Sequence, residues 1–121
     1  MRILPRLLGA ATALYSVAII RPALLARPCG LSSGPDGTAV ATPVAILIRA
    51  IGARDVAIGT AMVCALRGSA LRTATAARVV ADAADAVVFG TLLGERDRRM
   101  KIGGFAAGWA LLCGLSARWA G

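Results

Sequence analysis

The chain has 121 residues, which is the length of a single domain. Hydrophobic residues make up 58% of it and its mean hydropathy is +0.74, a composition too apolar for a soluble domain of this size and typical of a membrane protein. The net charge of +8 does not indicate nucleic-acid binding, because the arginines are spread singly and aromatic residues for base stacking make up only 4%. We expect most arginines to flank membrane spans instead.

Composition also limits the chemistry available. Histidine is absent, which removes the commonest metal ligand and the side chain that normally titrates near neutral pH. The three cysteines, Cys29, Cys64 and Cys113, are far apart and form no C-x-x-C pair, so neither a zinc site nor a disulfide framework is predicted. We therefore expect no metal and no cofactor, and acid–base chemistry would fall mainly to aspartate side chains.

The first apolar segment predicts a transmembrane helix over about residues 5–26. Its basic start resembles a signal peptide, but no convincing small-x-small cleavage site follows, so we expect the segment to be retained. Pro22 is expected to kink or end this helix, because proline lacks the backbone donor and clashes with the preceding turn. The stretch from Cys29 to Pro43 is rich in turn-forming residues and predicts a loop, with Pro43 in the first turn of the next helix.

The second predicted helix, residues 44–66, contains three charged residues: Arg49, Arg54 and Asp55. A charge near the centre of a bilayer costs about 2.5–3.5 kcal/mol on insertion scales, so these side chains should not face lipid. Gly52, Asp55 and Gly59 recur at i, i+3 and i+7 and share one helix face, where glycines allow close approach of another helix. Asp55 is therefore predicted to lie on the packed face, whereas the two arginines project to other sides.

The third predicted helix, residues 71–93, carries Arg78, Asp82 and Asp85 along one stripe, because their spacings are i+4 and i+3. Buried ion pairs of this kind can serve only to fix helix register. Ionisable residues within membrane segments, however, usually mark function. The sequence leaves both interpretations open.

The remaining stretch predicts a short solvated loop, residues 94–101, and a fourth helix, residues 102–119. Gly104-x-x-x-Gly108 predicts a close-packing face on that helix. Together these segments predict an all-α fold: a bundle of four transmembrane helices forming a single integral membrane domain, residues 1–121. We expect a multi-pass protein of the cell membrane.

Three of these motifs resemble a group of small four-helix bacterial membrane proteins, a domain family without an assigned function that is loosely similar to the DoxX-like proteins. The resemblance rests on Arg49-x-x-Gly52-Ala53-Arg54-Asp55-x-x-x-Gly59, on Arg27-Pro28-x-Gly30 and on Asp82-x-x-Asp85. It covers most of the chain, although only the first of these motifs is specific. It implies a four-helix membrane fold and no particular activity.

An intramembrane enzyme acting on an apolar small molecule or lipid is one functional hypothesis. A poorly solvated pocket can keep one carboxyl group protonated while a guanidinium keeps another ionised, which suits epoxide opening, isomerisation or cyclisation. The candidate catalytic residues are Asp82 and Asp85 as the acid–base pair, with Asp55 and Arg78. The candidate substrate-binding residues form a second group on the second helix: Arg54, Arg49, Gly52 and Gly59.

Two other functions fit the same residues. The glycine faces could bind a partner membrane protein or a second copy of the chain, with the charges serving to fix register in a non-catalytic subunit or scaffold. Alternatively, the acids could form a relay in a small proton-coupled transporter, which would require a homo-oligomer.

Overall fold

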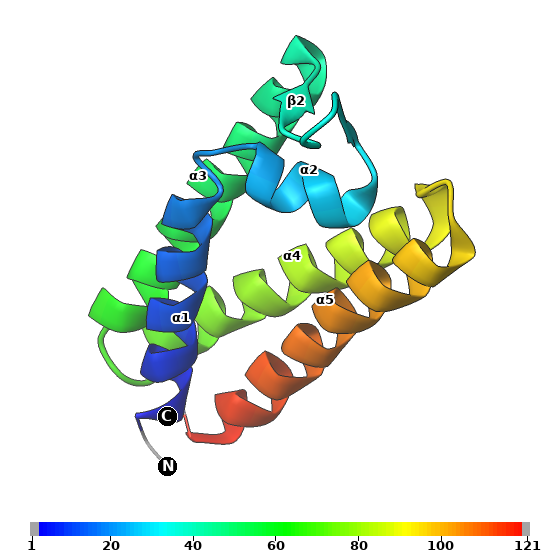
Figure 1. Cartoon of the computed structure of the whole chain (residues 1–121). Coiled ribbons are helices and arrows are strands. Elements are labelled where there is room, and N and C mark those ends of the chain that lie inside the picture. The colour runs from blue at the N-terminus through cyan, green and yellow to red at the C-terminus, as the bar shows by residue number, and fades with distance from the viewer. Residues whose placement is uncertain (1–2, 120–121) are drawn as a thin grey trace.

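Proline and glycine residues decide where the helices begin and end in the computed structural model, which describes residues 3–119. Within that range the fold is all-α, with five packed helices, one short hairpin and one 3-10 turn (Figure 1). The two-residue strands pair antiparallel, with Ser32 opposite Val40. The elements are α1 (Leu4–Ala18), α2 (Ala23–Cys29), β1 (Ser32–Ser33), β2 (Ala39–Val40), α3 (Thr42–Cys64), α4 (Ser69–Leu92), α5 (Arg96–Ser116) and η1 (Ala117–Trp119).

The first predicted helix is in fact two helices. α1 ends at Ala18 and α2 begins at Ala23 after a bend of 95°. Pro22 accounts for the break, because its ring would clash with the carbonyl of Ala18 four residues earlier and it has no N–H to donate. α2 ends at Cys29, and the residue that caps it, Gly30, has a left-handed conformation (φ 71°) that suits glycine.

The charged stretch 94–101 is not the predicted loop. α4 ends at Leu92 and α5 already begins at Arg96, so only three residues connect them. Arginine and lysine are good helix formers, and Asp97 in the first turn complements the helix dipole. The other predicted helix boundaries agree with the structure within a few residues, and Pro43 lies in the first turn of α3 as expected.

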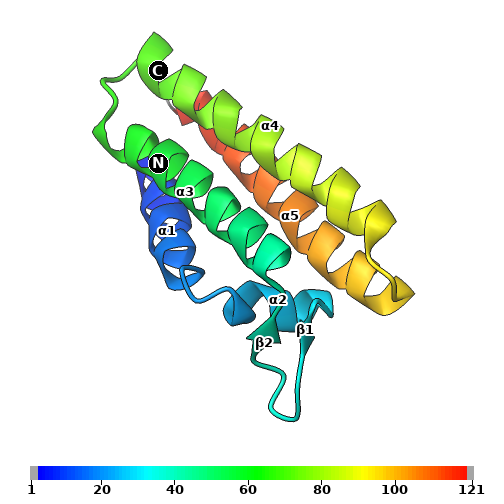
Figure 2. The same ribbon diagram turned by 90° about the horizontal axis from the view of Figure 1, so that it is seen from above.

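The helices form two closely packed pairs. α1 packs along α3, α4 packs along α5, and the contact between the pairs is less extensive (Figure 2). α2 and the hairpin lie at one end of the bundle, while the start of α1 and the end of α5 lie at the other (Figure 1). This arrangement leaves the facing sides of the two pairs as the place where an internal site can form.

Glycines bring the helices of each pair together. The buried face of α3 is the predicted one: Gly52, Asp55 and Gly59, extended by Ile48 and Met62. A Cβ on Gly59 would lie 2.5 Å from the carbonyl oxygen of Gly9 in α1, so only glycine fits there.

The predicted packing glycines of α5 are a different case. A Cβ on Gly104 or Gly108 would meet no atom within 4 Å, so the prediction of a packing face there is wrong within this chain. The close contact instead uses Gly103, where a Cβ would lie 2.9 Å from the Cα of Gly90 in α4. The register of α4 and α5 therefore places Gly103 in the helix contact and leaves the adjacent Gly104 outside it.

Two apolar clusters form the core, and polar residues lie between them along α1 and α3. Leu8 of α1 and Met62 of α3 belong to the cluster at one end, with Leu71 and Cys113. Ile19, Ala26 and Ile48 form the cluster near α2. Asp55 lies between Ile48 and Met62 on α3, and so belongs to a polar layer between two apolar ones.

The outer surface is strongly apolar. Large hydrophobic side chains are exposed on every helix, among them Leu14 in α1, Leu47 in α3, Val87 in α4 and Leu111 in α5. Within residues 3–119, length and composition qualify one segment, Arg96–Trp119, as a candidate membrane span, and the bent pair of α1 and α2 would be a second if counted as one. α3 and α4 do not qualify by that measure.

Gly59→Ala should destabilise the fold by about 1–3 kcal/mol, because the added methyl group overpacks the α1–α3 contact. Gly104→Ala is the matched control, since its methyl group meets open space and alanine favours helix by up to about 1 kcal/mol. Thermal unfolding of the two purified variants checks this. Equal stability of the two would contradict the packing of α1 on α3.

Candidate functional site

The site begins on α4, where Arg78 is the largest of the fully buried side chains and is only 1% exposed. One turn further along the helix, Asp82 faces it. Arg78 Nε donates to Asp82 Oδ2 at 2.8 Å, and Nη2 donates to Oδ1, so the contact is bidentate. The i, i+4 spacing seen in the sequence therefore produces an actual pair.

α3 supplies the next two members of the site. Arg78 Nη1 lies 2.9 Å from Asp55 Oδ1 in an ion pair that joins α4 to α3. Arg54 Nε donates to the same Asp55 Oδ1 at 2.8 Å. Arg54 then reaches back to α4, where Nη1 and Nη2 donate to the two carboxylate oxygens of Asp85 at 3.2 and 2.7 Å.

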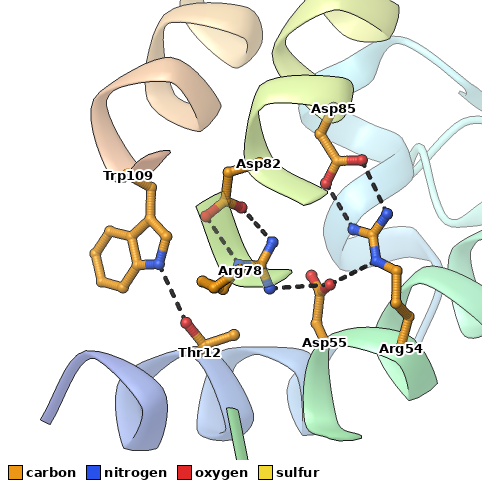
Figure 3. Close-up of polar contacts among 7 residues, drawn as sticks. All are labelled: Thr12, Arg54, Asp55, Arg78, Asp82, Asp85 and Trp109. Atoms are coloured by element: carbon orange, nitrogen blue, oxygen red, sulfur yellow. Dashed lines mark hydrogen bonds and ion pairs between the residues drawn. The ribbon is translucent and has the colours of Figure 1, made fainter. Parts of the chain in front are cut away.

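These contacts form an unbroken row that alternates acid and base: Asp82, Arg78, Asp55, Arg54, Asp85 (Figure 3). We call these five residues the Asp/Arg row. Both ends of it are acids. Asp55, in the middle, contacts two guanidinium groups, whereas each terminal acid contacts one. With all five ionised, the row carries one more negative than positive charge.

The Asp/Arg row forms part of the wall of a cavity of about 180 Å³. Asp55, Arg78, Asp82 and Asp85 line it, and most of the other lining residues are apolar. Four of the five aromatic residues of the chain also line the cavity: Tyr15, Phe89, Phe105 and Trp109. The site therefore combines a charged wall with an apolar and aromatic remainder, which is the usual character of a pocket for a small molecule.

α1 and α5 close the cavity opposite α3 and α4. Trp109 Nε1 in α5 donates to Thr12 Oγ1 in α1 at 3.1 Å (Figure 3). Phe105 stacks on Trp109 with ring centroids 6.1 Å apart. Tyr15 and Phe105 are 50% and 65% exposed while also lining the cavity, so its opening lies beside these two side chains.

The structure brings together five of the eight residues singled out from the sequence: Asp55, Asp82 and Asp85 with Arg54 and Arg78. Arg49 lies apart from them; its Nε donates to the carbonyl of Ile20 at 3.4 Å. Gly52 and Gly59 do not line the cavity, but pack against α1 and so place Asp55, which lies between them on α3.

Sequence reasoning missed the contribution of α1 and α5. Thr12 and Ser16 lie one turn apart on α1 and both line the cavity. A threonine and a serine at i and i+4 in a mainly apolar helix are a detectable signal, but nothing in the sequence connects them with Asp55 or Arg78. Trp109 and Phe105, likewise, could not be assigned to this site without the fold.

Comparisons of the chain with known protein families, with curated proteins and with solved structures give no match. The family resemblance drawn from the motifs therefore stays a prediction. Within residues 3–119, no group of three or more His, Cys, Asp and Glu side chains is arranged to hold a metal ion.

Arg78→Gln should destabilise the protein by about 3–5 kcal/mol, because it leaves Asp55 and Asp82 buried without the guanidinium that joins them. Arg49→Gln is the control, since that exposed side chain contacts only one carbonyl oxygen; its effect should be within about 0.5 kcal/mol. Thermal or denaturant unfolding measures both. A small effect of Arg78→Gln would mean that the Asp/Arg row is not what joins α3 to α4.

Proposed function

We propose that the protein is a four-span membrane protein that binds an apolar small molecule in the cavity beside the Asp/Arg row and acts on it by proton transfer. The observation that carries the proposal is that the three acids line a cavity rather than being sealed between helices. An ion-pair network serving only as a lock needs no space beside it. Buried ionisable groups next to an apolar pocket are typical of functional sites.

The charge count supports a proton within the row. Three carboxylates face two guanidinium groups, and an uncompensated charge in a poorly solvated interior is costly. The simplest compensation is a proton on one terminal acid, Asp82 or Asp85, because Asp55 contacts two guanidinium groups and each terminal acid only one. A protonated acid and an ionised acid would then lie at opposite ends of one row.

A protonated and an ionised carboxyl group together suit reactions in which the substrate gains one proton and another proton is removed in the same reaction. In an isomerisation or a cyclisation, the protonated carboxyl group gives its proton to a carbon or oxygen of the substrate. The ionised carboxylate removes a proton from another carbon, so that the row as a whole neither gains nor loses one. In epoxide opening, the acid protonates the epoxide oxygen, the carboxylate takes a proton from water, and the water oxygen bonds to carbon as the C–O bond breaks.

The proposal of a membrane location is supported by two features of the bundle: most charged residues of α3 and α4 are paired inside it, and apolar side chains are exposed outside it. α3 and α4 fail a simple test for membrane spans because each carries more than two charged residues, and all of these except Arg49 and Arg72 are paired in the Asp/Arg row. Their outward faces carry exposed apolar side chains, such as Ile46 and Leu47 on α3 and Val80 and Val87 on α4. Paired ions inside and apolar side chains outside are what a bundle in lipid requires. A ligand could then enter from the lipid beside Tyr15 and Phe105.

Asp82→Asn should destabilise the protein less than Arg78→Gln and leave it folded, because Arg78 keeps its pair with Asp55 and the variant row has two carboxylates for two guanidinium groups. It should also remove the surplus proton and lower turnover of the lipid-soluble epoxides or alkenes that the wild type converts by at least about 100-fold. Mass spectrometry of the products measures this, with Asp97→Asn, an exposed acid on α5, as control. If the protein is a non-catalytic scaffold, Asp82→Asn and Asp97→Asn will show no difference in turnover. Asp82→Asn will then lose a bound partner protein or stability instead.

Ala106→Phe should abolish retention of any apolar molecule that co-purifies with the wild type, because Ala106 is buried and lines the cavity. Ala107→Phe is a matched control with the same change of volume one residue away, at an exposed position that borders a separate groove between α4 and α5 and not this cavity. Native mass spectrometry detects the bound molecule. If Ala106→Phe retains it as well, the molecule binds somewhere other than this cavity.

A further inference from the structure

Two hydroxyl groups on α1 are left without an acceptor at the cavity. Ser16 is 1% exposed and Thr12 is 7% exposed, and both line the cavity together with the acids of α3 and α4. Ser16 Oγ has no hydrogen-bond partner among the described residues. A buried hydroxyl group without a partner costs about 1–3 kcal/mol, so such a group in a cavity points to something that binds there.

Other buried hydroxyl groups of this chain are satisfied locally. Thr75 Oγ1 in α4 donates to the carbonyl of Leu71 at 2.8 Å, and Ser116 Oγ in α5 donates to the carbonyl of Cys113 at 2.7 Å. This bond to the preceding turn is the ordinary arrangement for a hydroxyl group within a helix. Ser16 lies within a helix as well, yet it makes no such bond.

The hydroxyl group of Thr12 also lacks an acceptor for its proton. Its Oγ1 accepts the bond from Trp109 Nε1, but within residues 3–119 its own O–H donates to no atom. A hydroxyl group can accept and donate at once, so the donor remains available. Thr12 and Ser16 lie one turn apart, and therefore present two free O–H donors on one side of the cavity.

We propose that Ser16 binds the oxygen atom of the substrate, which is therefore an apolar molecule with an accepting oxygen, such as an epoxide, an ether or a ketone. The inference rests on the proposed function and names its substrate class. Ser16 Oγ donates a hydrogen bond to that oxygen from α1, and the protonated acid of the Asp/Arg row reaches it from α4. Two donors on one oxygen would both orient and polarise it.

The charges that line the cavity and the volume of the cavity limit the class of ligand further. Carboxylates and phosphates do not suit this cavity, because both guanidinium groups already pair with carboxylates of the row and an added anion would lack an opposite charge. A pure hydrocarbon would leave Ser16 unpaired. An engineered apolar cavity of about 150 Å³ in another protein binds benzene. A cavity of about 180 Å³ thus suits one ring with short substituents.

Limonene oxide and limonene test this, because they share a ring skeleton and differ by one oxygen. Trp109 lines the cavity and serves as the fluorescent reporter in a Trp119→Phe background. The parent protein should bind the oxide about threefold to tenfold more tightly than the hydrocarbon, the range expected for one hydrogen bond. Ser16→Ala should lose that preference with unchanged affinity for limonene, while Ser116→Ala, the matched control, should keep it.

Equal binding of the two probes by the parent protein, or a preserved preference in Ser16→Ala, would overturn the inference. So would an equal loss in Ser116→Ala, since that hydroxyl group is satisfied away from the cavity. The melting temperature provides a second readout: Ser16→Ala removes no hydrogen bond, so it should not lower it. If Ser16→Ala loses the preference for the oxide but the parent protein shows no turnover, this inference holds and the proposed catalysis is rejected. If the parent protein shows turnover but Ser16→Ala keeps the preference, the proposed catalysis holds and this inference is rejected.

Discussion

The pairing of Arg78 with Asp55 and Asp82 is the interaction on which the rest of the structure depends. Arg78 is nearly inaccessible, and an ion in such a place must be matched by opposite charge at contact distance. Asp82 supplies that match from the same helix and Asp55 supplies it from α3. A local pair on α4 thereby becomes the junction between two pairs of helices that otherwise contact each other less than they contact their own partners.

The cavity follows from the way in which the helix pairs are built. Glycines let α1 approach α3 and let α4 approach α5 so closely that each pair packs as a unit. Between the units the contact is less extensive, and the guanidinium group of Arg78 and four aromatic side chains line the cavity there. The charged wall and the cavity therefore occur together at the junction of the two helix pairs.

Under the proposed function, the Asp/Arg row serves both to join the helices and to transfer protons. Two guanidinium groups with two carboxylates would have been enough to join the helices. The row holds a third acid beyond this number, at a site where an unpaired charge is costly. This third acid and the unpaired hydroxyl group of Ser16 are the two observations that favour the proposed function over an ion-pair lock.

The sequence alone determined the helices α3 and α4, the buried face of α3 and the stripe of Arg78, Asp82 and Asp85, because each depends only on helical periodicity and on the avoidance of unpaired ions in an apolar setting. The sequence also predicted that the first helix would kink or end at Pro22, but it did not predict the size of the bend. The tertiary structure decided which ions meet, and it took Arg54 into the row while leaving Arg49 outside. It chose Gly103 over Gly104 and Gly108, and it brought Thr12, Ser16 and Trp109 to the same cavity. These outcomes depend on the register and crossing of helices far apart in the chain, and no local pattern specifies those.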